Sequence, residues 1–214
     1  MATIKSNLGN IEGKIGNGLY AYMRMGKNIL RKSPGKRKKS SEGQEVCMNS
    51  FSLMSMTYSY VKRVLELPIW KLAGKEYGKT ANNYFSHVNK GIFDKNGQVR
   101  DHDELVLSEG TLLNPSGMTI EQTGDTTYKI NWTPESEGKT GAEDDRLMVL
   151  VYKDETEEGH YFSILWAENT NGTRAEGTGT FTIPPVMGKE NLHVYCFFGS
   201  PDDSAYSRSK HFRI

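Results

Sequence analysis

The spacing of apolar residues changes along this chain of 214 residues, and each spacing permits only one kind of regular structure. Between residues 42 and 67 apolar side chains recur every three or four positions, as on one face of a helix. Beyond residue 115 they alternate with polar ones, as on a strand with one buried face. The first 40 residues show neither pattern. We therefore expect an α+β fold in three parts: residues 1–40, a helical region at 41–114 and a β-domain at 115–214.

Glycine recurs every few positions within residues 1–40. Each glycine in a helix costs about 1 kcal/mol relative to alanine, so a helix is not expected here. Two short apolar stretches, at 19–23 and 29–30, could pair as edge strands with a neighbouring molecule. We predict that residues 1–40 form an extended arm.

Charge is segregated along the chain. Residues 1–40 hold ten Lys or Arg against the single acid Glu12, whereas residues 101–214 hold nine basic and twenty acidic residues, so the net charge of +1 is a cancellation. A block of like charge attracts opposite charge elsewhere. We predict that the arm makes a distributed electrostatic contact with acidic protein surfaces or nucleic acid. The residues assigned to this contact are Lys14, Arg24, Lys27, Arg31, Lys32, Lys36, Arg37, Lys38 and Lys39.

The helical region is expected to form a hairpin of two helices. The first helix is predicted over residues 42–67, after a serine N-cap and before Pro68, which cannot continue it. The second is predicted over about residues 75–87, with Gly91 just beyond its end.

On the first helix the spacing of Met48, Met54 and Met56 favours core packing over a flexible contact surface. Asn96-Gly97 then favours a small β-hairpin.

Seven short runs with strand character follow, separated by turn residues, and this pattern is typical of a Greek-key β-sandwich. The runs are residues 118–123, 126–132, 146–152, 160–167, 178–183, 191–198 and 206–214. The alternating residues expected to face one common core are Ile130, Trp132, Met148, Leu150, Tyr152, Phe162, Ile164, Trp166, Phe181, Ile183, Leu192, Val194 and Cys196.

The sequence offers no catalytic constellation, and we expect no enzyme activity and no cofactor. Residues 9–14 resemble a phosphate-binding loop but lack the Ser or Thr that would hold magnesium. Residues 16–21 match G-x-G-x-x-A, but no buried strand precedes them and no helix pattern follows. Cys47 and Cys196 are expected to be reduced and packed, and Trp70 is the candidate exposed platform for a glycan.

A metal site is not expected either. The histidines never recur at intervals of two to four residues and never lie near a cysteine at ligand spacing, so a zinc motif is absent from the sequence. The acidic stretch at 101–104 is more typical of a solvated loop, and those at 143–145 and 154–158 of a repelling, solubilising surface. The five histidines are His87, His102, His160, His193 and His211.

Two resemblances can be drawn from these residues. Asn131-Trp132-Thr133-Pro134, at the end of the second expected strand, and the aromatic run 193–198 resemble the fibronectin type III and wider immunoglobulin-like sandwich over residues 115–214. A clear strand-F tyrosine corner is missing. Gly13-Lys14-Ile15-Gly16-Asn17, with Leu107–Leu112 further on, resembles an uncharacterised family of Bacteroidota and their phages. That family joins a glycine-rich basic N-terminus to an Ig-like C-terminal domain. It has no established activity, so the resemblance implies none for this chain.

The resemblance and the charge pattern together imply a non-enzymatic structural protein of a phage virion, either capsid-decorating or head-associated. We expect the partners to be other virion proteins such as the capsid shell, in many copies, with nucleic acid possible through the arm. No apolar run could span a membrane and no signal peptide is evident, so we expect synthesis in the host cytoplasm, no membrane partner and no small-molecule substrate. Two alternatives stay open: an Ig-like binding module for carbohydrate or a host surface, and a nucleic-acid-associated protein that uses the arm.

Overall fold

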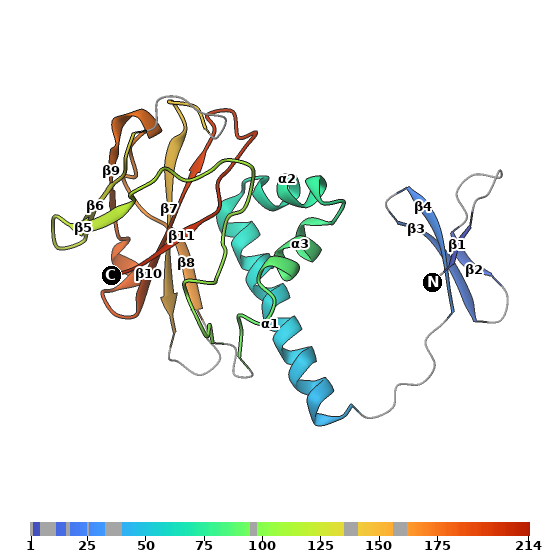
Figure 1. Ribbon diagram of the computed structural model, residues 1–214. Helices are drawn as coiled ribbons and strands as arrows, with labels where there is room; N and C mark the ends of the chain where they lie inside the picture. The colour runs from blue at the N-terminus through green and yellow to red at the C-terminus, as the bar shows by residue number, and fades with distance from the viewer. Residues whose placement is uncertain are drawn as a thin grey trace. The chain divides into compact units, whose positions relative to one another are not determined.

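The computed structural model describes residues 2–4, 12–15, 18–24, 26–32, 40–94, 98–134, 141–155 and 162–214. The chain divides into two compact units, Met1–Glu42 and Gly43–Ile214, and each is described by itself. Helices and antiparallel sheets occur together (Figure 1), so the predicted α+β class is confirmed.

The first unit contains a four-stranded antiparallel sheet in the order β1-β4-β3-β2. The prediction of an extended arm is therefore wrong for the described residues. The apolar stretches at 19–23 and 29–30 pair with each other, because Gly26 adopts a φ of 73° and lets the chain reverse between them. The strands are β1 (Ala2–Ile4), β2 (Gly13–Ile15), β3 (Leu19–Arg24) and β4 (Lys27–Lys32).

The second unit begins with three helices, where two were predicted. The first prediction is confirmed, since a helix starts at Glu42 and ends shortly before Pro68. The second is confirmed only from residue 81 to its end, because the chain turns at Gly78, whose φ is 62°, and restarts at Thr80, whose hydroxyl caps the next helix by accepting from the Asn83 N–H. The helices are α1 (Glu42–Leu65), α2 (Ile69–Glu76) and α3 (Ala81–Val88).

Within the described residues seven strands follow, one at each predicted run, although the third ends two residues and the sixth one residue beyond its run. They form two antiparallel sheets. The flanks of the predicted small hairpin also pair, through an antiparallel bridge between Phe93 and Val99, while its Asn96-Gly97 turn lies outside the described residues. One sheet has the order β5-β6-β9, with β5 (Thr119–Gln122), β6 (Thr127–Asn131) and β9 (Thr178–Thr182). The other, called the middle sheet below, has the order β11-β10-β7-β8, with β11 (Lys210–Arg213), β10 (Leu192–Gly199), β7 (Arg146–Asp154) and β8 (Phe162–Trp166).

The middle sheet is covered on both faces, by the β5-β6-β9 sheet on one side and by the helices on the other (Figure 1). Alternate residues of β7 illustrate this, since Val149 packs between the sheets and Leu150 packs toward the helices. The prediction of one common core is therefore wrong for six residues. The side chains that belong to the helical core instead are Met148, Leu150, Tyr152, Phe162, Ile164 and Trp166.

Two tryptophans tie the helices to the rest of this unit. The Trp166 Nε1–H of β8 donates to the Val64 carbonyl of α1 at 2.8 Å. The Trp70 Nε1–H of α2 donates to the Leu107 carbonyl at 3.1 Å, and Trp70 is only 3% exposed. The expectation of Trp70 as an exposed glycan platform is therefore wrong.

The N-terminal part of α1 carries apolar side chains on its surface. Of the three methionines that were expected to pack, Met54 is buried, whereas Met48 and Met56 are exposed. Cys196 is buried as expected but Cys47 is exposed, and neither forms a disulfide. Among the residues that the structure describes, no helix combines the length and apolar character needed to cross a membrane.

We expect Trp132→Ala to lower the free energy of unfolding by about 3–5 kcal/mol, the usual cost of truncating a buried aromatic residue. Trp132 is 5% exposed, its ring meets Phe198 of the opposite sheet edge-on at 5.1 Å, and its Nε1–H donates to the Arg174 carbonyl at 2.9 Å. Urea denaturation provides the measurement. Val186→Ala is the control, because Val186 is exposed and should change stability by less than about 0.5 kcal/mol. Equal midpoints for the two variants would contradict the packing described.

Candidate functional site

The pairing register of the N-terminal sheet gathers basic residues on one face. Directly opposite residues of paired strands share a face of the sheet. Tyr20 lies opposite both Lys14 and Arg31, and Arg24 lies opposite Lys27. We call this face the basic face, and its members on β2, β3 and β4 are Lys14, Tyr20, Tyr22, Arg24, Lys27, Ile29 and Arg31.

The basic side chains of this face are exposed, and so is Tyr20, at 43%. Lys32 is also exposed but belongs to the other face, since it lies opposite Leu19. The structure thus brings together four of the nine residues that the sequence assigned to electrostatic contact. The remaining four, Lys36, Arg37, Lys38 and Lys39, lie outside the described residues.

Such a face attracts carboxylates or phosphates without fixing their positions. Each exposed ion pair contributes roughly 0.2–1 kcal/mol, so affinity grows with the number of contacts and falls with added salt. The two tyrosines add flat apolar surface between the charges. These properties suit an extended acidic partner better than a single small ligand.

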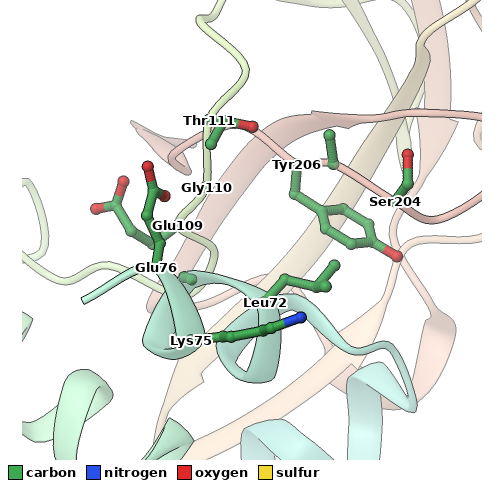
Figure 2. A pocket seen from close by; sticks show the side chains of 10 residues that line it. Leu72, Lys75, Glu76, Glu109, Gly110, Thr111, Ser204 and Tyr206 are labelled. Atoms are coloured by element: carbon green, nitrogen blue, oxygen red, sulfur yellow. The ribbon is translucent and has the colours of Figure 1, made fainter. Parts of the chain in front are cut away.

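The larger unit has a pocket of about 380 Å³ between α2, residues 109–111 and residues 204–206. Figure 2 shows Leu72 and Lys75 reaching toward it from α2 and Tyr206 on the opposite wall. Burial raises the pKa of Glu109, while the Arg208 guanidinium and the Gly110 N–H lower it, and the net shift is upward. The volume lies within the range of ligand pockets.

Close backbone packing forms one wall of this pocket. The Leu112 N–H donates to the Tyr206 carbonyl at 3.0 Å, and the Ser209 N–H donates to the Ser108 carbonyl at 2.9 Å. At Gly110 an added Cβ would lie 2.3 Å from the Tyr206 carbonyl oxygen. Residues 107–112, which carried part of the family resemblance, therefore hold the start of the β-domain against the segment before β11.

A second group of polar side chains lies on the helix-facing side of the middle sheet. His193 lies opposite Tyr152, and His211 lies opposite Tyr195, so these four share the face from which Tyr152 and Tyr195 contribute to the helical core. His102 comes from the loop before the β-domain, and its ring stacks on that of His193 with centroids 3.4 Å apart. We call His102, His193 and His211 the histidine cluster.

Hydrogen bonds use nearly every polar atom of the histidine cluster. His102 contacts the Tyr195 hydroxyl through Nδ1 and Asp154 Oδ2 through Nε2, both at 2.9 Å. His193 Nδ1 lies 2.9 Å from His211 Nε2. On its other side, His211 Nδ1 lies 2.6 Å from Asp103 Oδ1.

These contacts shift the titration of the acids and of one histidine. Burial raises the pKa of Asp154, but hydrogen bonds from His102 and His193 outweigh it and lower that pKa to about 2. The hydrogen bond from His211 lowers the pKa of Asp103. Burial lowers the pKa of His211; Asp103 opposes this, while His193 and His102 add to it. His211 is therefore held toward its neutral form.

Comparison with known protein families, curated proteins and solved structures gave no significant match.

Sequence spacing missed the histidine cluster. The predicted absence of a zinc motif rested on local intervals, but the three residues lie on a loop and on two strands that meet only through the sheet register. A usable signal was nevertheless present. His193 interrupts a strand that is otherwise apolar and aromatic, and a polar residue at such a position requires a partner.

We expect Gly110→Ala to lower the free energy of unfolding by about 1–3 kcal/mol, the usual cost of overpacking, because the new methyl group would meet the Tyr206 backbone. The control is Gly43→Ala in α1, where an added Cβ has no neighbour within 4 Å. That change should leave stability equal or up to about 1 kcal/mol higher, since alanine favours a helix. Thermal denaturation of both variants makes the comparison. A Gly110→Ala protein as stable as Gly43→Ala would refute the packing.

Proposed function

We propose that this protein is a non-enzymatic structural protein of a phage virion, capsid-decorating or head-associated, anchored by its N-terminal unit. The observation that carries the proposal is that the exposed basic face belongs to a compact unit of its own. Residues 1–42 hold ten basic and two acidic residues, whereas residues 43–214 hold seventeen basic and twenty-four acidic ones. One unit is thus suited to attach to an acidic surface and the other to remain displayed.

The strand order of the larger unit supports an immunoglobulin-like sandwich of the fibronectin type III kind as the displayed part. In such domains strands A, B and E share one sheet and strands C, F and G share the other. The orders β5-β6-β9 and β11-β10-β7-β8 correspond to A-B-E and G-F-C, with β8 added beside C. The buried Trp132 at the end of β6 agrees with this assignment.

A shell contact fits the basic face because it needs many weak ion pairs rather than one shaped cavity. Lys14, Arg24, Lys27 and Arg31 are spread over three strands. A single substitution should therefore have a small effect, whereas loss of several charges should weaken attachment strongly. The displayed unit carries net negative charge, which disfavours its binding to the same acidic surface.

The test is release of the protein from purified particles of the phage that encodes it, measured across a salt series. We expect the variant with Lys14, Arg24, Lys27 and Arg31 all changed to Gln to be released at a clearly lower salt concentration than the wild type. The matched control changes four exposed lysines of the helices and their connections, Lys62, Lys71, Lys75 and Lys90, to Gln, which removes the same charge. It should be released like the wild type.

Two results would contradict the proposal. One is absence of the protein from purified particles, and the other is equal salt release of both four-residue variants. A second candidate is supported by Tyr20 and Tyr22, since aromatic side chains among basic ones can stack on nucleic-acid bases. If the basic-face variant loses binding to single-stranded DNA while its retention on particles is unchanged, this nucleic-acid role replaces the shell contact.

A further inference from the structure

The histidine cluster has the spacing of ligands around a single cation. One ring nitrogen from each of His102, His193 and His211 lies within 4.8 Å of the corresponding atoms of the other two. Zinc binds imidazole nitrogen at about 2.0–2.1 Å in tetrahedral geometry, which places two ligand nitrogens about 3.3 Å apart. Side-chain rotation, including a turn of His102 out of its stack on His193, would bring the three rings to ligand distance.

The hydrogen bonds indicate which atoms would bind. His211 Nδ1 is occupied by Asp103, so its Nε2 remains, and this atom faces His193 Nδ1 at 2.9 Å. A cation between these two nitrogens would take the place of the proton that they share, after they separate by about 0.4 Å. His102 would exchange one of its two contacts, with Tyr195 or with Asp154, for the cation.

The two carboxylates complete a typical metal environment. Metal-binding histidines usually donate their second ring N–H to a carboxylate or carbonyl, which fixes the ring and raises its basicity. Asp103 Oδ1 accepts such a bond from His211 Nδ1. Asp154 Oδ2 lies 2.9 Å from His102 and 3.4 Å from His193, so its charge would offset that of a dication at the three rings.

The three histidines are also largely shielded from water. The side chains of His102, His193 and His211 are only 12%, 12% and 7% exposed, which limits screening by water.

We propose that His102, His193 and His211 bind one Zn²⁺ ion. Imidazole donors suit zinc and its first-row neighbours rather than magnesium or calcium, which prefer oxygen. The ion would join the loop at 101–104 to β10 and β11. This site is independent of the basic face and of the role proposed for it.

The experiment titrates chelator-treated, full-length protein with Zn²⁺ at pH 7.5 by calorimetry. We expect one ion per chain, no competition from Mg²⁺, and a loss of affinity of at least tenfold in His211→Gln. Asp103→Asn should lose about 10–100-fold, the usual effect of removing a carboxylate behind a ligating histidine. Asp103 is exposed, so this variant keeps its fold and tests the site even if His211→Gln does not fold. His87→Gln is the matched control, because His87 is an exposed histidine of α3.

Circular dichroism first confirms that each protein is folded. Folded wild-type protein that binds no zinc would overturn the proposal and leave the cluster as a hydrogen-bond network alone. Zinc binding of unchanged affinity in both folded His211→Gln and Asp103→Asn would also overturn it. So would a loss of zinc in His87→Gln, since that would place the ion on the helical surface.

Discussion

The burial of both faces of the middle sheet is the constraint on which the larger unit depends. Strands β7 and β10 are nearly continuous apolar runs, and neither could face water on one side without exposing large side chains. One face is covered by the β5-β6-β9 sheet and the other by the helices. The helices are therefore a third layer of the same unit, and the hydrogen bonds of Trp166 and Trp70 hold that layer in place.

The same constraint explains where the polar groups gather. On the helix-facing side, the apolar core includes Tyr195 and Phe197 of β10, but two residues before Tyr195 the side chain is His193. There the loop at 101–104 covers the sheet through His102, and the polar atoms pair with one another and with Asp154. The histidine cluster thus occupies a part of the face where hydrogen bonds replace apolar packing.

Much of the fold could be predicted from sequence, because periodicity reports local structure well. The helix α1 lies within its predicted segment, and each of the seven strands described in the larger unit overlaps a predicted run. The contacts between segments far apart in the sequence were not predicted. A continuous run such as 147–152 shows that a strand is buried but not which layer each face meets. In the described part of the first 40 residues, the frequent glycines correctly indicated that no helix forms. Nothing in the two short apolar stretches indicated that they would pair with each other. Likewise, only strand register brings His193 beside His211.

The most direct test of this account compares two fragments, residues 43–214 and residues 115–214, by denaturation and size-exclusion chromatography. We expect the 43–214 fragment to be soluble and to unfold in a single transition, because it contains all three layers. We expect the 115–214 fragment to aggregate or fail to fold, because removal of the helices exposes one apolar face of the middle sheet. The side chains left without their helical partners are Leu150, Tyr152, Ile164, Tyr195 and Phe197. A soluble, monomeric 115–214 fragment as stable as 43–214 would contradict the claim that the helices are part of the fold.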